Sequence, residues 1–242
     1  MEWFRPGSRT SAAIQYKDGG SPVSEADFAA DRCLADRLRT AMPDAAWLSE
    51  ESVDDPSRLS CRHVVVVDPI DGTRGFCAGD ARWAVCIALV TDGRPTVGVV
   101  HAPVLDQTFT AVVNHGAFCN GAPIRASTRR DLRDGIVAMP GQLPRHVAWP
   151  GLFRIAPRIP SLACRLVHVA AGFLDAAVAA PNANDWDIAA ADLILREAGA
   201  MLTDRHGVLP IYNRPRPSHP MLIAGPGPLH HALLGVMSRA GD

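Results

Sequence analysis

The sequence predicts an α+β fold, and two patterns along the chain indicate it. Between residues 63 and 113, apolar strand-like segments follow one another with short turns, which is typical of an antiparallel meander. From about residue 127, strand-like and helical segments alternate instead. The change of pattern falls near 125–135 and predicts two subdomains, residues 1–128 and 129–242.

The first regular element is a helix over residues 24–42. Ser24 is a good N-cap, Asp27 lies three residues later, and apolar residues then recur at helical spacing. Pro43 cannot continue a helix, so we expect the helix to end before it.

The run H-V-V-V-V at 63–67 predicts a strand that is buried on both faces, because its residues do not alternate between apolar and polar. We expect a turn at 68–73, where Pro69 and Gly72 interrupt the pattern. Further strands are expected at 83–90, 96–101 and 108–113, with turns at 91–95 and at Asn120-Gly121.

The second half predicts two strands and two helices in alternation. Short strands are expected at 136–139 and 174–179, and a helix is expected between them at 161–171. Residues 188–198 form a strongly apolar helix that ends at Gly199.

The composition is that of an ordinary globular protein. The chain has 242 residues, 48% hydrophobic and 20% charged. Its 24 basic residues face 25 acidic ones, so there is no excess positive charge for a phosphate backbone, and we expect no nucleic-acid polymer as partner. The most apolar segment, 167–180, is too short for a membrane span. Since no secretion signal is visible, we expect a cytoplasmic protein.

Cysteine and histidine give no sign of a soft-metal site. The six cysteines lie far apart without a C-x-x-C pair, so we expect reduced thiols. The histidines show no ligand-like spacing, and we expect the adjacent His230 and His231 at the surface.

Three acidic segments stand out. Residues 48–52 read L-S-E-E-S, which taken alone is more typical of a solvated surface than of a functional site. Asp68 and Asp71 follow a buried strand, where two carboxylates are costly to hold together without a cation between them. Asp187 stands at the start of an apolar helix, where helix capping is as good an interpretation as function.

Taken together, the segments make a stronger case than any one of them. Glu50, Asp68, Asp71 and Asp187 are hard oxygen donors, which favour Mg²⁺, Mn²⁺ or Ca²⁺ over zinc or iron. The glycine turn at Gly72 and Thr73 offers backbone amides to a phosphate. The combination indicates metal-assisted phosphoryl transfer to water.

The motifs D-P-I-D-G-T, S-E-E and W-D-I-A-A-A-D-L-I-L-R-E-A-G-A resemble the signature blocks of the inositol monophosphatase superfamily. The resemblance extends from about residue 17 to residue 224, and the two long motifs stand in the family's order. It implies a layered αβαβα sandwich of the sugar-phosphatase type, with the site between the two halves, and a homodimer.

The resemblance also implies roles for individual residues. Two or three Mg²⁺ ions would be held by Glu50, Asp68, the carbonyl of Ile70, Asp71 and Asp187. The catalytic residues would be Glu50, Thr73 and Asp27, with Thr73 and Asp27 orienting and deprotonating the attacking water. The substrate, a small phosphate ester, would contact Gly72, Thr73, Arg74 and Asp187, although Arg74 is equally typical of a surface arginine.

The resemblance leaves several substrates open. Residues 21–27 and 48–51 look more like the branch that hydrolyses 3′-phosphoadenosine 5′-phosphate, and the first block is also similar to histidinol-phosphate phosphatases. Inositol phosphatases place an acid seven positions before the distal aspartate, where this chain has Ala180. We expect an inositol monophosphatase-like phosphomonoesterase, with a bisphosphate nucleotidase or histidinol-phosphate phosphatase as alternatives. An inactive, metal-binding regulatory protein is the alternative of a different class.

Overall fold

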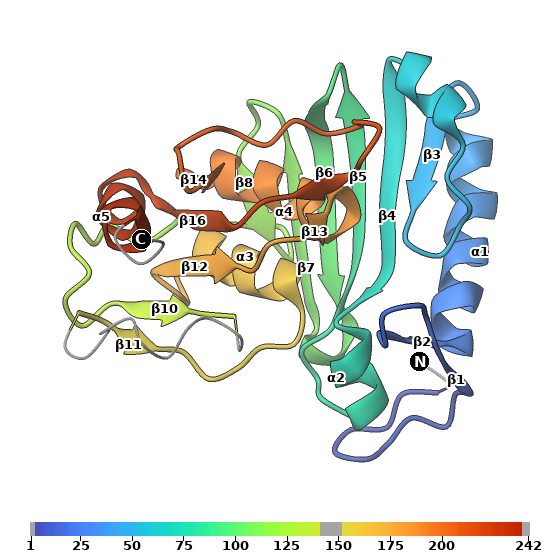
Figure 1. Cartoon of the computed structure of the whole chain (residues 1–242), viewed down its shortest axis with the longest axis horizontal. Coiled ribbons are helices and arrows are strands. Elements are labelled where there is room, and N and C mark those ends of the chain that lie inside the picture. The colour runs from blue at the N-terminus through green and yellow to red at the C-terminus, as the bar shows by residue number, and fades with distance from the viewer. Residues whose placement is uncertain (1–2, 141–151, 239–242) are drawn as a thin grey trace.

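The computed structural model describes residues 3–140 and 152–238 (Figure 1). The first half contains β1 (Ile14–Tyr16), β2 (Pro22–Ser24), α1 (Glu25–Ala41), β3 (Ala46–Ser49), η1 (Pro56–Ser60), β4 (His63–Asp71), α2 (Thr73–Ala78), β5 (Ala84–Thr91), β6 (Arg94–Ala102), η2 (Pro103–Leu105), β7 (Gln107–Val112), β8 (Ala117–Cys119) and β9 (Ala122–Pro123). The second half contains β10 (Ile136–Ala138), β11 (Arg154–Ile155), α3 (Leu162–Ala170), β12 (Ala176–Ala179), β13 (Ala183–Asn184), α4 (Asp185–Glu197), β14 (Ala200–Asp204), β15 (Ser218–His219), β16 (Leu222–Pro226) and α5 (Gly227–Ser238).

These elements form five layers, as the αβαβα expectation requires. Helix α1 packs on β4 of a seven-stranded sheet with the strand order β3-β4-β5-β6-β7-β8-β9. Helices α3 and α4 lie between this sheet and a five-stranded sheet with the order β11-β10-β12-β16-β14, and α5 packs on β16 (Figure 1). The α+β class and the sandwich architecture are therefore confirmed.

Helix α1 begins and ends where its sequence predicts. Ser24 and Asp27 form a capping box at its start, and Met42 is the C-cap residue directly before Pro43. This local signal is strong because every group that makes it lies within four residues of the helix start.

The predicted meander is confirmed, with one correction. Strands β4 to β9 pair antiparallel in chain order, while β3 runs parallel to β4. The turn expected at 68–73 is wrong for residues 68–71, since β4 continues to Asp71, and Gly72 alone connects it to α2. The strand absorbs Pro69 through a shift of register between Asp68 and Asp71, because proline has no N–H for the sheet.

The second half follows the predicted alternation and adds elements that carry no strong local pattern. The strands β10 and β12 and the helices α3 and α4 are confirmed, but α4 begins earlier than predicted, at Asp185. The expectation for His230 is wrong: it is only 3% exposed, because its side of α5 faces the second sheet. His231 is exposed as expected.

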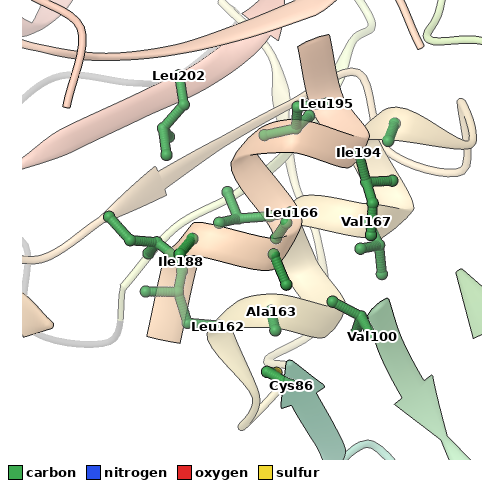
Figure 2. Packing of buried hydrophobic residues seen from close by; sticks show 14 of the residues in the cluster. Cys86, Val100, Leu162, Ala163, Leu166, Val167, Ile188, Ile194, Leu195 and Leu202 are labelled. Carbon is green, nitrogen blue, oxygen red and sulfur yellow. The ribbon is translucent and has the colours of Figure 1, made fainter. Parts of the chain in front are cut away.

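One hydrophobic core joins the two halves. Helices α3 and α4 pack against each other and against β5 and β6, so Leu162 and Ala163 lie near Cys86 and Val100 (Figure 2). The second sheet alternates its faces: Ala177 belongs to this core, whereas its neighbours along β12 pack under α5. The division at residues 128 and 129 stays a prediction.

No helix in the ranges 3–140 and 152–238 combines the length and the apolar character that a bilayer crossing requires.

Candidate active site

All predicted site residues except Asp27 line one cavity of about 180 Å³ at the carboxyl end of β4. It is lined by Ser21, Pro22, Glu50, Asp68, Ile70, Asp71, Gly72, Thr73, Arg74, Arg158, Pro160 and Asp187. We call this cavity the acidic hollow, after Glu50, Asp68, Asp71 and Asp187. These four acids come from three separate parts of the chain, and the fold brings them to one place.

Three of the four acids converge most closely. Glu50 follows β3, Asp68 lies in β4 and Asp187 lies in the first turn of α4. One carboxylate oxygen of each lies within 4.8 Å of the others. These oxygens come from residues that the sequence places up to 137 positions apart, and their approach concentrates negative charge in a buried place.

Asp68 is the most deeply buried of these acids, with none of its surface exposed. Its Oδ1 accepts from the amide of Ile70 at 2.9 Å, while Oδ2 has no hydrogen-bond partner in the described part of the chain. Burial raises the pKa of Asp68 well above its usual range, and the nearby charges of Glu50 and Asp71 raise it further. A buried carboxylate oxygen without a partner is costly unless a cation or another donor meets it.

Asp187 caps a helix and also lies beside the other acids of the hollow. Its Oδ2 accepts from the amide of Asn184 at 2.6 Å and completes a capping box at the start of α4. One of its oxygens also belongs to the convergent triad. Burial raises the pKa of Asp187 well above its usual range, and the charge of Asp71 adds to this effect.

Asp71 lines the hollow but lies outside the convergent triad. Its carboxylate is held by the start of α3, through the Ser161 hydroxyl at 2.5 Å and the amides of Ala163 at 2.6 Å and Leu162 at 3.3 Å. Burial raises the pKa of Asp71, and these hydrogen bonds oppose that rise.

Glu50 already has a cation beside it. The ammonium of Lys17 lies 2.9 Å from Glu50 Oε1 and 2.8 Å from Glu51 Oε1. Burial raises the pKa of Glu51 to about 7, although the hydrogen bond from Lys17 lowers it. Lys17 therefore offsets charge at the edge of the hollow, whereas Asp68 has no such partner in the described residues.

Thr73 and Asp27 face each other as the resemblance implies. Thr73 Oγ1 lies 3.3 Å from Asp27 Oδ1 and 3.0 Å from the carbonyl of Ile70. Asp27 is buried and its Oδ2 accepts from both the amide and the hydroxyl of Ser24, which fixes its orientation. Burial raises the pKa of Asp27, and the hydrogen bonds from Ser24 oppose that rise.

The turn between β4 and α2 requires its glycine for two reasons. Gly72 has φ of +92°, a left-handed conformation that other residues rarely adopt. A Cβ at this position would also lie 3.0 Å from the amide nitrogen of Ser161. Arg74, in the next turn, is exposed and donates from Nη2 to the carbonyl of Gly20 at 2.9 Å.

The contacts of Ser161, Lys17 and Arg158 at this site were not predicted from the sequence. Ser161 holds Asp71, Lys17 contacts Glu50, and Arg158 lines the hollow. Ser161 stands at a predicted helix start, which signals a cap but not a contact with a residue 90 positions away. Only the fold reveals that contact.

The donor set suits a hard divalent cation. Every convergent ligand atom is a carboxylate oxygen, and no cysteine or histidine of the described residues joins the group. The Asp68 oxygen without a partner is the atom that a cation would satisfy. The residues present therefore fit Mg²⁺ on structural grounds.

Comparison with known proteins agrees with this geometry. The model of the inositol monophosphatase family matches residues 2–237. A fructose-1,6-bisphosphatase/inositol-1-monophosphatase from Thermotoga maritima is 35% identical over 193 residues, which cover 76% of this chain and 72% of that protein. A histidinol-phosphatase from Mycobacterium tuberculosis is 35% identical over 210 residues, which cover 81% of this chain and 78% of that protein.

Solved structures give the same result. The extragenic suppressor protein SuhB of Bartonella henselae superimposes with a TM-score of 0.81 at 31% identity, with 95% of this chain and 89% of that chain covered. The chain therefore belongs to the inositol monophosphatase family and is a phosphatase, a hydrolase of phosphoric monoesters.

Proposed function

We propose that this phosphatase is Mg²⁺-dependent and hydrolyses a small phosphorylated metabolite in the acidic hollow. The observation that carries the proposal is the convergence of Glu50, Asp68 and Asp187 within 4.8 Å, with one oxygen of the fully buried Asp68 left without a partner in the described chain. Such an arrangement is unfavourable by itself and becomes favourable when a divalent cation binds.

The proposed cation ligands are Glu50, Asp68, the carbonyl of Ile70, Asp71 and Asp187, which together line the hollow. Bound Mg²⁺ supplies Lewis acidity at the phosphoryl group and lowers the pKa of water. We propose two or three ions, as the family resemblance implies. Glu50 has 25% of its side chain exposed, so we also propose that it faces the attacking water.

Thr73 and Asp27 are the proposed pair that handles the proton. The Thr73 hydroxyl has two acceptors within reach, the Ile70 carbonyl at 3.0 Å and Asp27 Oδ1 at 3.3 Å. When it donates to Asp27, its oxygen is free to accept from the attacking water. The pair would then orient that water and pass its proton through the Thr73 hydroxyl to Asp27 as the new P–O bond forms. The P–O ester bond breaks, and the departing alkoxide takes a proton from solvent to become the alcohol.

The phosphate group is proposed to bind at the turn that begins α2. The amides of Gly72 and Thr73 lie before the first helical hydrogen bond, where backbone N–H groups lack intrahelical acceptors. Arg74 and Asp187 line the same hollow and are the proposed contacts to the rest of the substrate.

The leading substrate class is an inositol phosphate or a similar polyol phosphate. The fructose-1,6-bisphosphatase/inositol-1-monophosphatase relative supports it. A second candidate is histidinol phosphate, since the chain is equally similar to a histidinol-phosphatase and has Ala180 where inositol phosphatases carry an acid. Hydrolysis of 3′-phosphoadenosine 5′-phosphate stays an alternative from the sequence motifs.

Phosphate release from these three substrates tests the proposal, with metal-stripped protein measured alone and then with Mg²⁺. We expect release only with Mg²⁺, inhibition by excess Ca²⁺, and a clear preference within the panel. Turnover that survives thorough chelation would contradict the metal dependence. Mg²⁺ binding without turnover of any substrate would favour the inactive regulatory alternative.

Light scattering tests the homodimer, which stays a prediction, as does the cytoplasmic location.

A further inference from the structure

Ser161 lies at the point where the second half of the chain meets Asp71. It is the N-cap residue of α3 and is fully buried. Its hydroxyl oxygen accepts from the amide of Cys164 at 2.9 Å, as an N-cap does. The same hydroxyl donates its single hydrogen to Asp71 Oδ2 at 2.5 Å. Ser161 therefore has a second contact that helix capping does not require.

The contacts divide the two oxygens of Asp71 unequally. Oδ2 accepts from the Ser161 hydroxyl and from the amide of Ala163 at 2.6 Å, whereas within residues 3–140 and 152–238 Oδ1 accepts only from the amide of Leu162 at 3.3 Å. A carboxylate oxygen offers about two lone pairs. Oδ2 is thus occupied by the protein, and Oδ1 keeps its capacity for another ligand.

The backbone beside Asp71 is fixed against the same residue. A Cβ on Gly72 would lie 3.0 to 3.2 Å from the amide nitrogen, Cα and Cβ of Ser161, so the two segments are in close contact. Leu162 and Ala163 are themselves held in the shared core with Cys86 (Figure 2). The start of α3 is therefore a rigid support for the carboxylate.

We infer that Ser161 is a positioning residue for cation binding. Its hydroxyl holds Asp71 Oδ2, so that Oδ1 is presented to the hollow, and the amides of Leu162 and Ala163 fix the plane of the carboxylate. The inference rests on the proposed function, since it assigns the support of one proposed ligand. It also explains why a ligand from the first half of the chain depends on a helix of the second half.

Two variants separate positioning from capping. Ser161→Ala removes both the cap and the donor, while Ser161→Gly removes the donor but costs the helix start much less than alanine does. We expect both to weaken Mg²⁺ affinity by the same factor, about 10-fold to 100-fold, as losing the support of a metal ligand does. Isothermal titration of the metal-stripped protein measures this affinity, and thermal unfolding in EDTA measures stability. The alanine variant should unfold at a lower temperature than the glycine variant.

Two controls complete the experiment. Ser161→Thr keeps the hydroxyl and should retain most of the Mg²⁺ affinity. Asp55→Ala removes the cap of η1, where Asp55 accepts from the amide of Ser57 at 2.9 Å, and should leave the affinity unchanged.

The outcomes distinguish the inference from the function on which it rests. Wild-type affinity in Ser161→Gly would overturn the inference, as would a pattern in which affinity only follows stability. Failure of both variants to fold would show that the contact serves the fold, and would also overturn it. If the wild-type protein itself takes up no Mg²⁺, the proposed function fails instead.

Discussion

Two regions of this protein bury carboxylates, and they treat them in opposite ways. The acidic hollow leaves Asp68 Oδ2 without a partner in the described chain. A second region, which we call the tyrosine anchor, consists of Arg58, Asp185, Asp192, Tyr212, Asn213 and His219. There both oxygens of the buried Asp185 are paired, with His219 Nε2 at 2.7 Å and with the amide of Asn213 at 2.8 Å.

The two regions differ in how the protein compensates the negative charge of their buried acids. In the tyrosine anchor the protein supplies its own donors and the positive charge of Arg196, and the hydrogen bonds hold the segment around Tyr212 against α4 and η1. In the hollow the fold brings four acids together and leaves Asp68 Oδ2 without a partner among the described residues, which is destabilising without a cation. Asp192 Oδ1 in the tyrosine anchor also lacks a hydrogen bond, but Arg196 Nε lies 3.5 Å from it. Acidity and burial alone therefore do not mark a site; in the described residues the mark is a buried carboxylate oxygen, that of Asp68, with neither a hydrogen bond nor a cationic side chain beside it.

The largest predicted effect is that of Asp68→Asn. We expect turnover to fall by at least about 10⁴-fold, since a ligand charge is lost from the proposed cation site. In EDTA the same variant should unfold a few degrees higher than the wild type, because it removes a buried charge and about 1 kcal/mol shifts the melting temperature by roughly 2–4 °C at this size. Phosphate release and thermal unfolding check the two parts, with the exposed Asp44→Asn as control. If Asp68→Asn melted at a lower temperature than the wild type in EDTA, the Asp68 carboxylate would be stabilising without a cation, and the two regions would not differ in this respect.

From the sequence alone, a gain in stability without metal would also be expected for Asp71→Asn, because it too removes repulsion between the two carboxylates. The structure argues against this expectation. In Asp71→Asn a neutral amide replaces the carboxylate that accepts from Ser161 and Ala163. The weaker repulsion from the neighbouring acids is therefore opposed by the loss of hydrogen bonds. We therefore expect Asp71→Asn to lose turnover without gaining stability in EDTA.

The next effect concerns hydroxyl groups in the two regions. The Tyr212 hydroxyl donates to Asp192 at 2.9 Å, whereas Thr73 Oγ1 lies near two acceptors, Ile70 and Asp27. If the Thr73 hydroxyl donates to Asp27 instead of Ile70 during turnover, Thr73→Ala should lower kcat by about 10²-fold to 10⁴-fold with little change in Mg²⁺ affinity. Thr73→Ser should retain much of the rate.

A double-mutant cycle tests the pairing. Asp27→Asn should resemble Thr73→Ala, and the double variant should be no slower than the slower single variant, because the two residues act as one unit. Steady-state kinetics at saturating Mg²⁺ measures the cycle. Effects that multiply in the double variant would show that the two residues act separately.

In the tyrosine anchor we expect a substitution to lower stability and to leave Mg²⁺ binding unchanged. Tyr212→Phe removes the donor to Asp192 and leaves a buried acceptor without it, which costs about 1–3 kcal/mol. Urea unfolding should report this loss, while Mg²⁺ affinity stays within twofold of the wild type. A large loss of affinity would mean that the anchor is part of the site.

The parts of the fold that the sequence predicts are those with local signals. The capping box of Ser24 and Asp27 and the valine run of β4 carry their information within a few residues. The support of Asp71 by Ser161 does not, because the residues lie 90 positions apart and a serine before a helix predicts only a cap. Likewise, His230 is buried through packing of α5 on the second sheet, which no neighbouring residue signals.

The smallest predicted effect is a pH dependence within the tyrosine anchor. Burial raises the pKa of Asp192 above its usual range, although Arg196, the Tyr212 hydroxyl, Arg94 and His219 lower it. The folded protein therefore binds this proton more tightly than the unfolded chain does. The resulting stability is fully present below the unfolded pKa of about 3.9 and is lost as pH rises through the higher folded value.

Asp192→Asn tests this sign, because asparagine does not titrate and its side-chain oxygen can still accept from Tyr212. We expect the free energy of unfolding of the variant, relative to the wild type, to increase between pH 4 and pH 8, by about 1.4 kcal/mol for each unit by which burial raises the pKa. Urea unfolding in EDTA across this range measures the difference. A difference that stays constant or falls with pH would mean that the donors around Asp192 offset its burial completely, in which case the tyrosine anchor contrasts with the acidic hollow even more strongly than its geometry indicates.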